Sequence, residues 1–203
     1  MRVLLMALLA SWFGVSAQAE NQNVLTVKDM VELTRYEQVG AGRDTVLRGM
    51  SITKRIPRGW VDDFSERYLR TIVDDDGVTR HQVLLEMQYV GGWRYYRAAT
   101  LADGQQLRFK AEERKFSRCS SAFLKCDQRE IVTADLSREQ LKEAMNKGLV
   151  VYFEAKKPGR DTVARFPAAY VLAYLIKLDG DDSVLPAGDG VETSNIVAVN
   201  ASR

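Results

Sequence analysis

The chain has little of what most catalytic and metal centres are built from. Among its 203 residues there is one histidine, His81, and there are two cysteines, Cys119 and Cys126. A zinc site needs more ligands than two cysteines supply, and a redox centre usually has C-x-x-C spacing. The G-x-S-x-G, phosphate-loop and dinucleotide motifs are absent as well. The sequence therefore predicts no catalytic residue, no metal and no cofactor, and His81 is interpreted as an ordinary histidine near a strand end.

An excess of charge of one sign is also missing. Lysine and arginine total 29 and aspartate and glutamate total 27. A nearly neutral chain of this kind gives no electrostatic reason to expect nucleic acid or another polyanion as a partner.

Long apolar segments are confined to the N-terminus. Met1-Arg2 precedes an apolar stretch at 3–15, and Ala17-Gln18-Ala19 resembles a cleavage site. The stretch is shorter than the roughly 20 apolar residues of a membrane-spanning helix. We interpret 1–19 as a cleavable signal peptide and expect a soluble mature protein, without a transmembrane segment, in a bacterial periplasm or outside the cell.

The remaining length suits one globular unit. Residues 20–180 are predicted to form a single β-rich domain, because this length can bury a substantial core. Residues 181–203 are rich in Asp, Gly, Ser and Asn and are predicted to be a flexible tail. In an oxidising compartment, Cys119 and Cys126 are expected to form a disulfide that pins the end of a hairpin.

Three glycine-containing dipeptides predict tight turns in the middle of the chain, at Asp76-Gly77, Gly91-Gly92 and Asp103-Gly104. They delimit four expected strands, at about 66–75, 78–90, 93–102 and 105–118. Two-residue turns would place Tyr68 opposite Leu85, Met87 opposite Tyr96, Leu85 opposite Ala98, Ala98 opposite Phe109, and Thr100 opposite Leu107. The same register predicts a core face of Tyr68, Val83, Leu85, Met87, Tyr96, Ala98, Leu107, Phe109 and Ala111.

Helix signals flank this region. Ser137 with Gln140 predicts a capping box and a helix that ends at Gly148. Leu149 to Ala155 and 162–166 favour strands, and a second helix is expected after Pro167. The predicted fold class is α+β and mainly β, an antiparallel β-meander of about five to seven strands with two or three short helices on or beside the sheet.

One surface is a candidate for function. The predicted register places Glu86 beside Arg97 and Arg97 beside Lys110 on a polar sheet face. Aromatic and arginine side chains are common anchors of interfaces. A solvated outer face is the alternative interpretation. The candidate binding residues are Trp93, Tyr95, Arg97, Arg108 and Lys110.

The sequence leaves two functions open. The first is an exported cell-envelope protein that binds another envelope protein or a cell-wall glycan through this polar aromatic-basic face. The second is a small hydrolase of envelope polysaccharide, in which Asp62, Asp63 or Glu66 would act as acid and base.

Overall fold

The computed structural model describes residues 25–39, 44–57, 63–120 and 125–180, including their side chains except at 117–120, 125 and 126. The predicted signal peptide and C-terminal tail lie outside these ranges. None of the described helices has the length and the apolar content needed to cross a bilayer.

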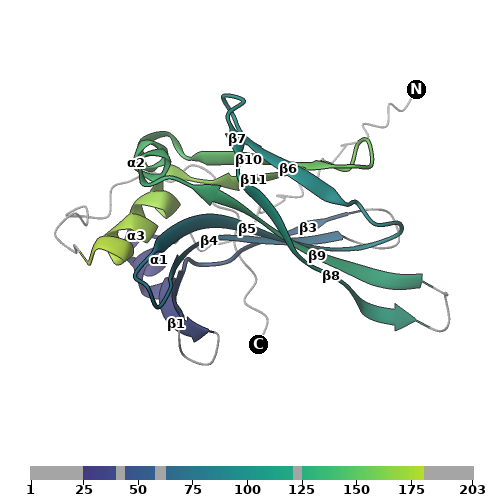
Figure 1. Cartoon of the computed structure of the whole chain (residues 1–203), viewed down its shortest axis with the longest axis horizontal. Coiled ribbons are helices and arrows are strands. Elements are labelled where there is room, and N and C mark those ends of the chain that lie inside the picture. Colours follow the sequence, from purple (N-terminus) through teal and green to yellow (C-terminus); the bar gives the residue numbers. More distant parts are fainter. Residues whose placement is uncertain (1–24, 40–43, 58–62, 121–124, 181–203) are drawn as a thin grey trace, which may run out of the picture.

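The described chain forms two open antiparallel sheets and three helices, which confirms the predicted fold class (Figure 1). The large sheet has the order β1-β2-β4-β5-β9-β8, and β3 pairs with β4. Its strands are β1 (Arg35–Val39), β2 (Asp44–Arg48), β3 (Ile52–Ile56), β4 (Asp63–Val73), β5 (Thr79–Val90), β8 (Phe109–Ser120) and β9 (Lys125–Leu136). The small sheet has the order β11-β10-β6-β7. Its strands are β6 (Tyr96–Leu101), β7 (Gln106–Leu107), β10 (Leu149–Ala155) and β11 (Thr162–Phe166).

The helices gather at one end of the molecule, where they are α1 (Val27–Leu33), α2 (Arg138–Lys147) and α3 (Ala168–Asp179). The predicted capping box of Ser137 and Gln140 begins α2, and Gly148 ends it. The side-chain oxygen of Ser137 accepts a hydrogen bond from the Gln140 amide, and the Gln140 side chain accepts one from Ser137, so each satisfies a donor that the helix leaves open.

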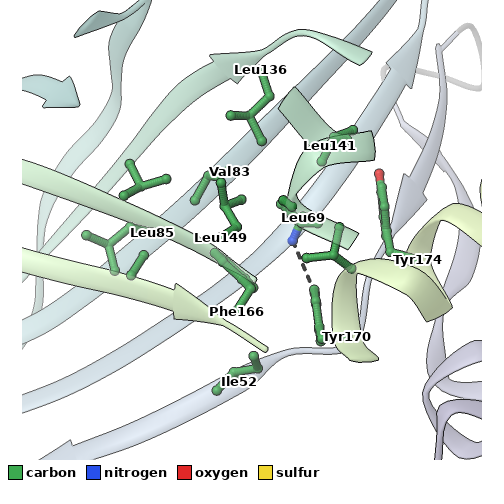
Figure 2. Close-up of a cluster of buried hydrophobic side chains, with 14 of the residues drawn as sticks. Ile52, Leu69, Val83, Leu85, Leu136, Leu141, Leu149, Phe166, Tyr170 and Tyr174 are labelled. Carbon is green, nitrogen blue, oxygen red and sulfur yellow. Dashed lines mark hydrogen bonds between the residues drawn. The ribbon is translucent and has the colours of Figure 1, made fainter. Parts of the chain in front are cut away.

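The core lies between the sheets and α3 (Figure 2). β2 and β3 both pair with β4, and the chain between them leaves the ladder at residues 49–51. The hydroxyl of Tyr170 on α3 replaces the missing ladder partner, because it accepts from the Leu69 amide at 3.2 Å and donates to the Met50 carbonyl at 2.8 Å. A Cβ atom at Gly49 would lie 2.5 Å from that hydroxyl, so this position has room only for glycine.

A second tyrosine of α3 connects to the single histidine. Tyr174 hydrogen-bonds Thr71 at 2.7 Å, and Thr71 hydrogen-bonds His81 Nδ1 at 2.7 Å. Burial, followed by the positive charge of Arg138, lowers the pKa of His81 below its ordinary value. Thr71 and Tyr174 are buried and His81 is half-buried, so the histidine is hydrogen-bonded to the core.

The register of the first predicted hairpin is wrong by one residue. Tyr68 lies opposite Leu84, and Leu85 lies opposite Arg67. The reason is the turn: Asp74 and Val78 are paired, and the loop between them has three residues that end at Gly77, whose φ is +77°. A turn followed by a left-handed glycine adds one residue to the loop, and every side chain of the strand changes its partner.

The Asp103-Gly104 turn also has a loop of three residues where a loop of two is predicted. Leu101 donates to the Gln105 carbonyl, and Gly104 has a φ of +87°. Thr100 therefore pairs with Gln106 and not with Leu107. An aspartate before a glycine predicts a turn at these positions correctly, but it does not distinguish a loop of two residues from a loop of three.

The pairing predicted across Gly91-Gly92 does not exist. β5 lies between β4 and β9, whereas β6 leaves the large sheet and pairs with β7 and β10. The expected pairs of Met87 with Tyr96 and Leu85 with Ala98 are therefore wrong. The predicted pair of Ala98 with Phe109 is wrong as well, because Phe109 lies opposite Ala134.

The predicted core face is correct in part. Val83, Leu85, Met87 and Tyr96 are buried, and Leu107, Phe109 and Ala111 are partly buried against the core. Tyr68 lies on the other face of β4 from the buried Leu69, and Ala98 is only half-buried. Leu84 and Ala99 lie two residues from Glu86 and Arg97, and so belong to the same predicted polar face, but both are buried. Between Ala155 and Glu154 the register on β6 skips Arg97, and this bulge turns Ala99 inward.

The cysteines are neighbours in the backbone pairing. Cys119 on β8 lies directly opposite Cys126 on β9, at the end of this hairpin. Their side chains are not among those described, so the predicted disulfide lies outside the described part of the structure.

Candidate binding site

The predicted binding surface is divided between the two sheets. Arg97 is on β6 of the small sheet and forms an exposed ion pair with Glu154. Lys110 is on β8 of the large sheet, opposite Thr133. Arg108 lies between β7 and β8, and its carbonyl accepts from the Asp135 amide. The three basic residues therefore do not share one sheet face.

The aromatic members of that surface do come together, with a third ring that the sequence did not indicate. The ring centroid of Trp93 lies 5.3 Å from Phe116 and 6.4 Å from Tyr95. Tyr95 is 46% exposed and Phe116 is 56% exposed, while Trp93 is half-buried. We name Trp93, Tyr95 and Phe116 the aromatic platform.

The backbone of the platform is fixed in an uncommon conformation. Tyr95 has a φ of 53°, and it is the only non-glycine residue in the described ranges with a positive φ. Such a conformation costs energy and persists where surrounding contacts impose it. Its carbonyl accepts from the Lys156 amide at 3.0 Å.

The buried carboxylate of Glu130 hydrogen-bonds to the backbone of the same segment. Glu130 has no exposed surface, and its Oε1 accepts from the amides of Arg94 at 3.0 Å and Tyr95 at 3.2 Å. The same oxygen accepts a short hydrogen bond from the hydroxyl of Tyr89. Glu130 therefore fixes the backbone at residues 94 and 95, next to the rings of the platform.

Arg114 connects this carboxylate to the exposed rings. Its Nε donates to Glu130 Oε2 at 3.0 Å, and its Nη2 donates to the Tyr96 carbonyl at 3.2 Å. Its guanidinium carbon lies 5.3 Å from the ring centroid of Tyr95, within the range of a cation–π contact. Tyr95 is thus held at its backbone and at its ring.

A buried arginine extends the network to the small sheet. Arg94 is 4% exposed, pairs with Asp63 and donates to the Tyr96 hydroxyl at 3.1 Å. Its guanidinium also lies 4.2 Å from the ring centroid of Tyr89. The Tyr96 hydroxyl hydrogen-bonds Thr162 on β11 at 2.6 Å. Burial raises the pKa of both Tyr89 and Tyr96, so both hydroxyls keep their protons at neutral pH. We name Asp63, Tyr89, Arg94, Tyr96, Glu130 and Thr162 the buried network, to which the exposed Arg114 is joined through Glu130.

One polar group beside the platform is unsatisfied. Gln128 is 6% exposed, and its Oε1 is one of two described buried side-chain atoms without a hydrogen-bond partner. Gln128 lies opposite Phe116 in the pairing of β9 with β8, and opposite Tyr89 in the pairing of β9 with β5. Buried acceptors in native proteins are rarely left unpaired.

The acidic residues considered for hydrolysis point in different directions. Asp63 is buried on the inner face of β4 and pairs with Arg94. Glu66 is three positions along the same strand, so it points to the other face, where it contacts Arg48 at 2.8 Å and Ser51 at 2.6 Å. Asp62 lies outside the described residues. Asp63 and Glu66 therefore cannot flank one scissile bond.

Sequence reasoning did not assign Glu130, Arg114 or Phe116 to the site. The alternation of β9 does contain a signal, since Gln128, Glu130 and Val132 fall on one face with Ala134 and Leu136. A glutamate on an inward face must be paired when it is buried. Its partners could not be identified, because they come from β5, β8 and the segment before β6.

Comparison of the chain with protein-family models, curated proteins and solved structures found no match. In the part of the chain that the structure describes, no group of three or more His, Cys, Asp or Glu side chains could hold a metal ion. The function of the site must therefore be inferred from its geometry.

Proposed function

We propose that the protein is a binding module of the bacterial cell envelope, and that the aromatic platform takes up a cell-wall glycan. The observation that carries the proposal is the contact of Trp93 with both Tyr95 and Phe116, which presents three adjacent rings above a buried charged network. Aromatic rings of this kind stack on the apolar face of a sugar.

The rigidity of the platform supports this proposal. A surface that is ordered before it meets its ligand loses little conformational entropy on binding. The contacts of Glu130 with two consecutive amides, and of Arg114 with the Tyr95 ring, fix the platform in the free protein.

The test measures binding of the mature chain to purified peptidoglycan sacculi and to an N-acetylglucosamine tetramer. Trp93→Ala should weaken binding at least tenfold, since truncation of a central aromatic hot-spot residue costs about 2 kcal/mol or more. Tyr95→Asn should act likewise without distorting the turn, because asparagine tolerates positive φ. Gln128→Leu should leave binding unchanged, because the side chain is buried, while the free energy of unfolding stays equal or rises because an unsatisfied acceptor is removed.

Tyr152→Ala is the matched control, because Tyr152 is a tyrosine of similar exposure (41%) on β10 of the small sheet. It should bind as the parent protein does. Equal binding by the platform variants and the parent would refute the proposal. If the parent protein retained an envelope protein and not the glycan, and Trp93→Ala did not retain it, the platform would be reassigned to a protein partner.

We further propose that the mature chain is exported to an oxidising compartment, where Cys119 and Cys126 are joined. Directly opposite residues of antiparallel strands have Cα atoms about 4.5 to 5.5 Å apart, which a disulfide can bridge. Protein from a periplasmic fraction should resist thiol alkylation until it is reduced, and reduction should lower the free energy of unfolding by about 2 kcal/mol. Alkylation of both thiols without reductant would exclude the disulfide.

A further inference from the structure

A pocket at the other end of the large sheet has the features of an anion site. It has a volume of about 240 Å³ and lies between the end of α1, β1 and the segment that joins β2 to β3. Its lining residues are Leu33, Arg35, Glu37, Arg48, Gly49, Met50 and Ser51. Because this segment leaves the ladder of β4, the pocket opens where the sheet edge is interrupted.

Two arginines line this pocket in direct cross-strand register. Arg35 on β1 lies opposite Arg48 on β2. Like charges in this position repel each other and destabilise a sheet. An anion between the two guanidinium groups would convert the repulsion into two attractive contacts.

Arg48 is held in place by its own contacts. Its Nη2 donates to Glu66 at 2.8 Å and to Ser51 at 3.1 Å, and its guanidinium carbon lies 4.2 Å from the ring centroid of Tyr68. A guanidinium that is fixed on one side can offer its remaining N–H groups to a ligand without a large loss of entropy.

The side chain of Arg35, in contrast to that of Arg48, makes no ion pair or hydrogen bond with the described residues. The two carboxylates near the pocket both lie close to Arg48: Glu66 is its hydrogen-bond partner, and Glu37 lies 4.0 Å from its Nη1. The positive charge that remains uncompensated in the pocket is therefore that of Arg35.

We infer that this pocket binds a small oxyanion, a carboxylate or a phosphate group, which Arg35 pairs with and Arg48 orients. Planar guanidinium groups match both kinds of oxyanion. The site is independent of the aromatic platform, whose residues lie on β8 and in the segment between β5 and β6.

Thermal unfolding of the mature protein tests the inference, with inorganic phosphate and acetate as separate probes and sodium chloride at equal ionic strength as the reference. A ligand that binds only the folded state raises the Tm. We expect at least one oxyanion to raise the Tm by about 3 °C above the chloride reference. A shift with phosphate alone would identify a phosphate site, and a shift with both would identify a general oxyanion site.

Arg35→Gln should abolish the oxyanion shift, and in chloride it should be at least as stable as the parent because the like-charge pair is gone. Arg35→Lys should keep part of the shift. Arg80→Gln is the matched control, since Arg80 is an exposed strand arginine outside the pocket, and it should keep the full shift. Absence of any oxyanion shift, or the same shift in Arg35→Gln, would overturn the inference.

Discussion

Replacing Glu130 with alanine is expected to lower the free energy of unfolding by about 2–4 kcal/mol, because it leaves buried donors without an acceptor at about 1–3 kcal/mol each. The carboxylate has no exposed surface, and its loss would leave the Tyr89 hydroxyl and the Tyr95 amide without their acceptor, while the Arg94 amide would keep the Tyr89 oxygen as its acceptor. Urea unfolding followed by circular dichroism measures this change. The slope of the free energy of unfolding against urea concentration, the m value, should stay the same if the compactness of both states is preserved.

Glu154→Ala is the control for this prediction. Glu154 also accepts from an arginine, Arg97, but both side chains are at least half exposed. Exposed pairs contribute about 1 kcal/mol or less. Equal losses in the two variants would show that the buried network adds nothing beyond a surface contact, and the explanation of the fixed platform would have to be withdrawn.

Gly49→Ala is expected to cost about 1–3 kcal/mol of stability, since the new methyl group must push the Tyr170 ring away from β4 in a packed core. A Cβ atom there would approach the hydroxyl to 2.5 Å and the Leu69 carbonyl to 3.2 Å. Thermal unfolding of the variant measures the loss.

The double variant Gly49→Ala/Tyr170→Phe tests whether the loss in Gly49→Ala comes from a clash with the Tyr170 hydroxyl. Tyr170→Phe alone leaves the Leu69 amide and the Met50 carbonyl without a partner, at a cost of about 1–3 kcal/mol. Because the phenylalanine also removes the atom that the alanine would strike, the double variant should lose less than the sum of the single variants. Strict additivity would contradict the proposed clash. Gly92→Ala, whose Cβ would meet only the flexible end of Lys157, should have little effect.

Elements whose signals are local could be predicted from the sequence. The capping box at Ser137, the strand at Leu149 to Ala155 and the helix after Pro167 all occur as expected. In each case the residues that determine the element lie within it or next to it, so no knowledge of a distant partner is needed.

Partner choice could not be predicted, because it depends on contacts between distant segments. The glycine turns indicated where strands end, but β9 pairs with β5 and takes the place predicted for β6. An error in one pairing then moved Arg97 and Lys110 onto a common face that the sheets do not have. Trp93 and Tyr95 stayed together because they are two residues apart in the chain, whereas Phe116 was missed because it comes from β8.

The departure of β6 from the large sheet also limits the order in which the chain can fold. Its neighbour β10 begins at Leu149, so the hairpins β4–β5 and β8–β9 can close early, whereas the small sheet must wait for the distant C-terminal segment. Pairings of large sequence separation form slowly, since loop entropy is lost before contacts compensate for it. A chain that acquires its second sheet last stays incompletely folded until nearly all of it is available.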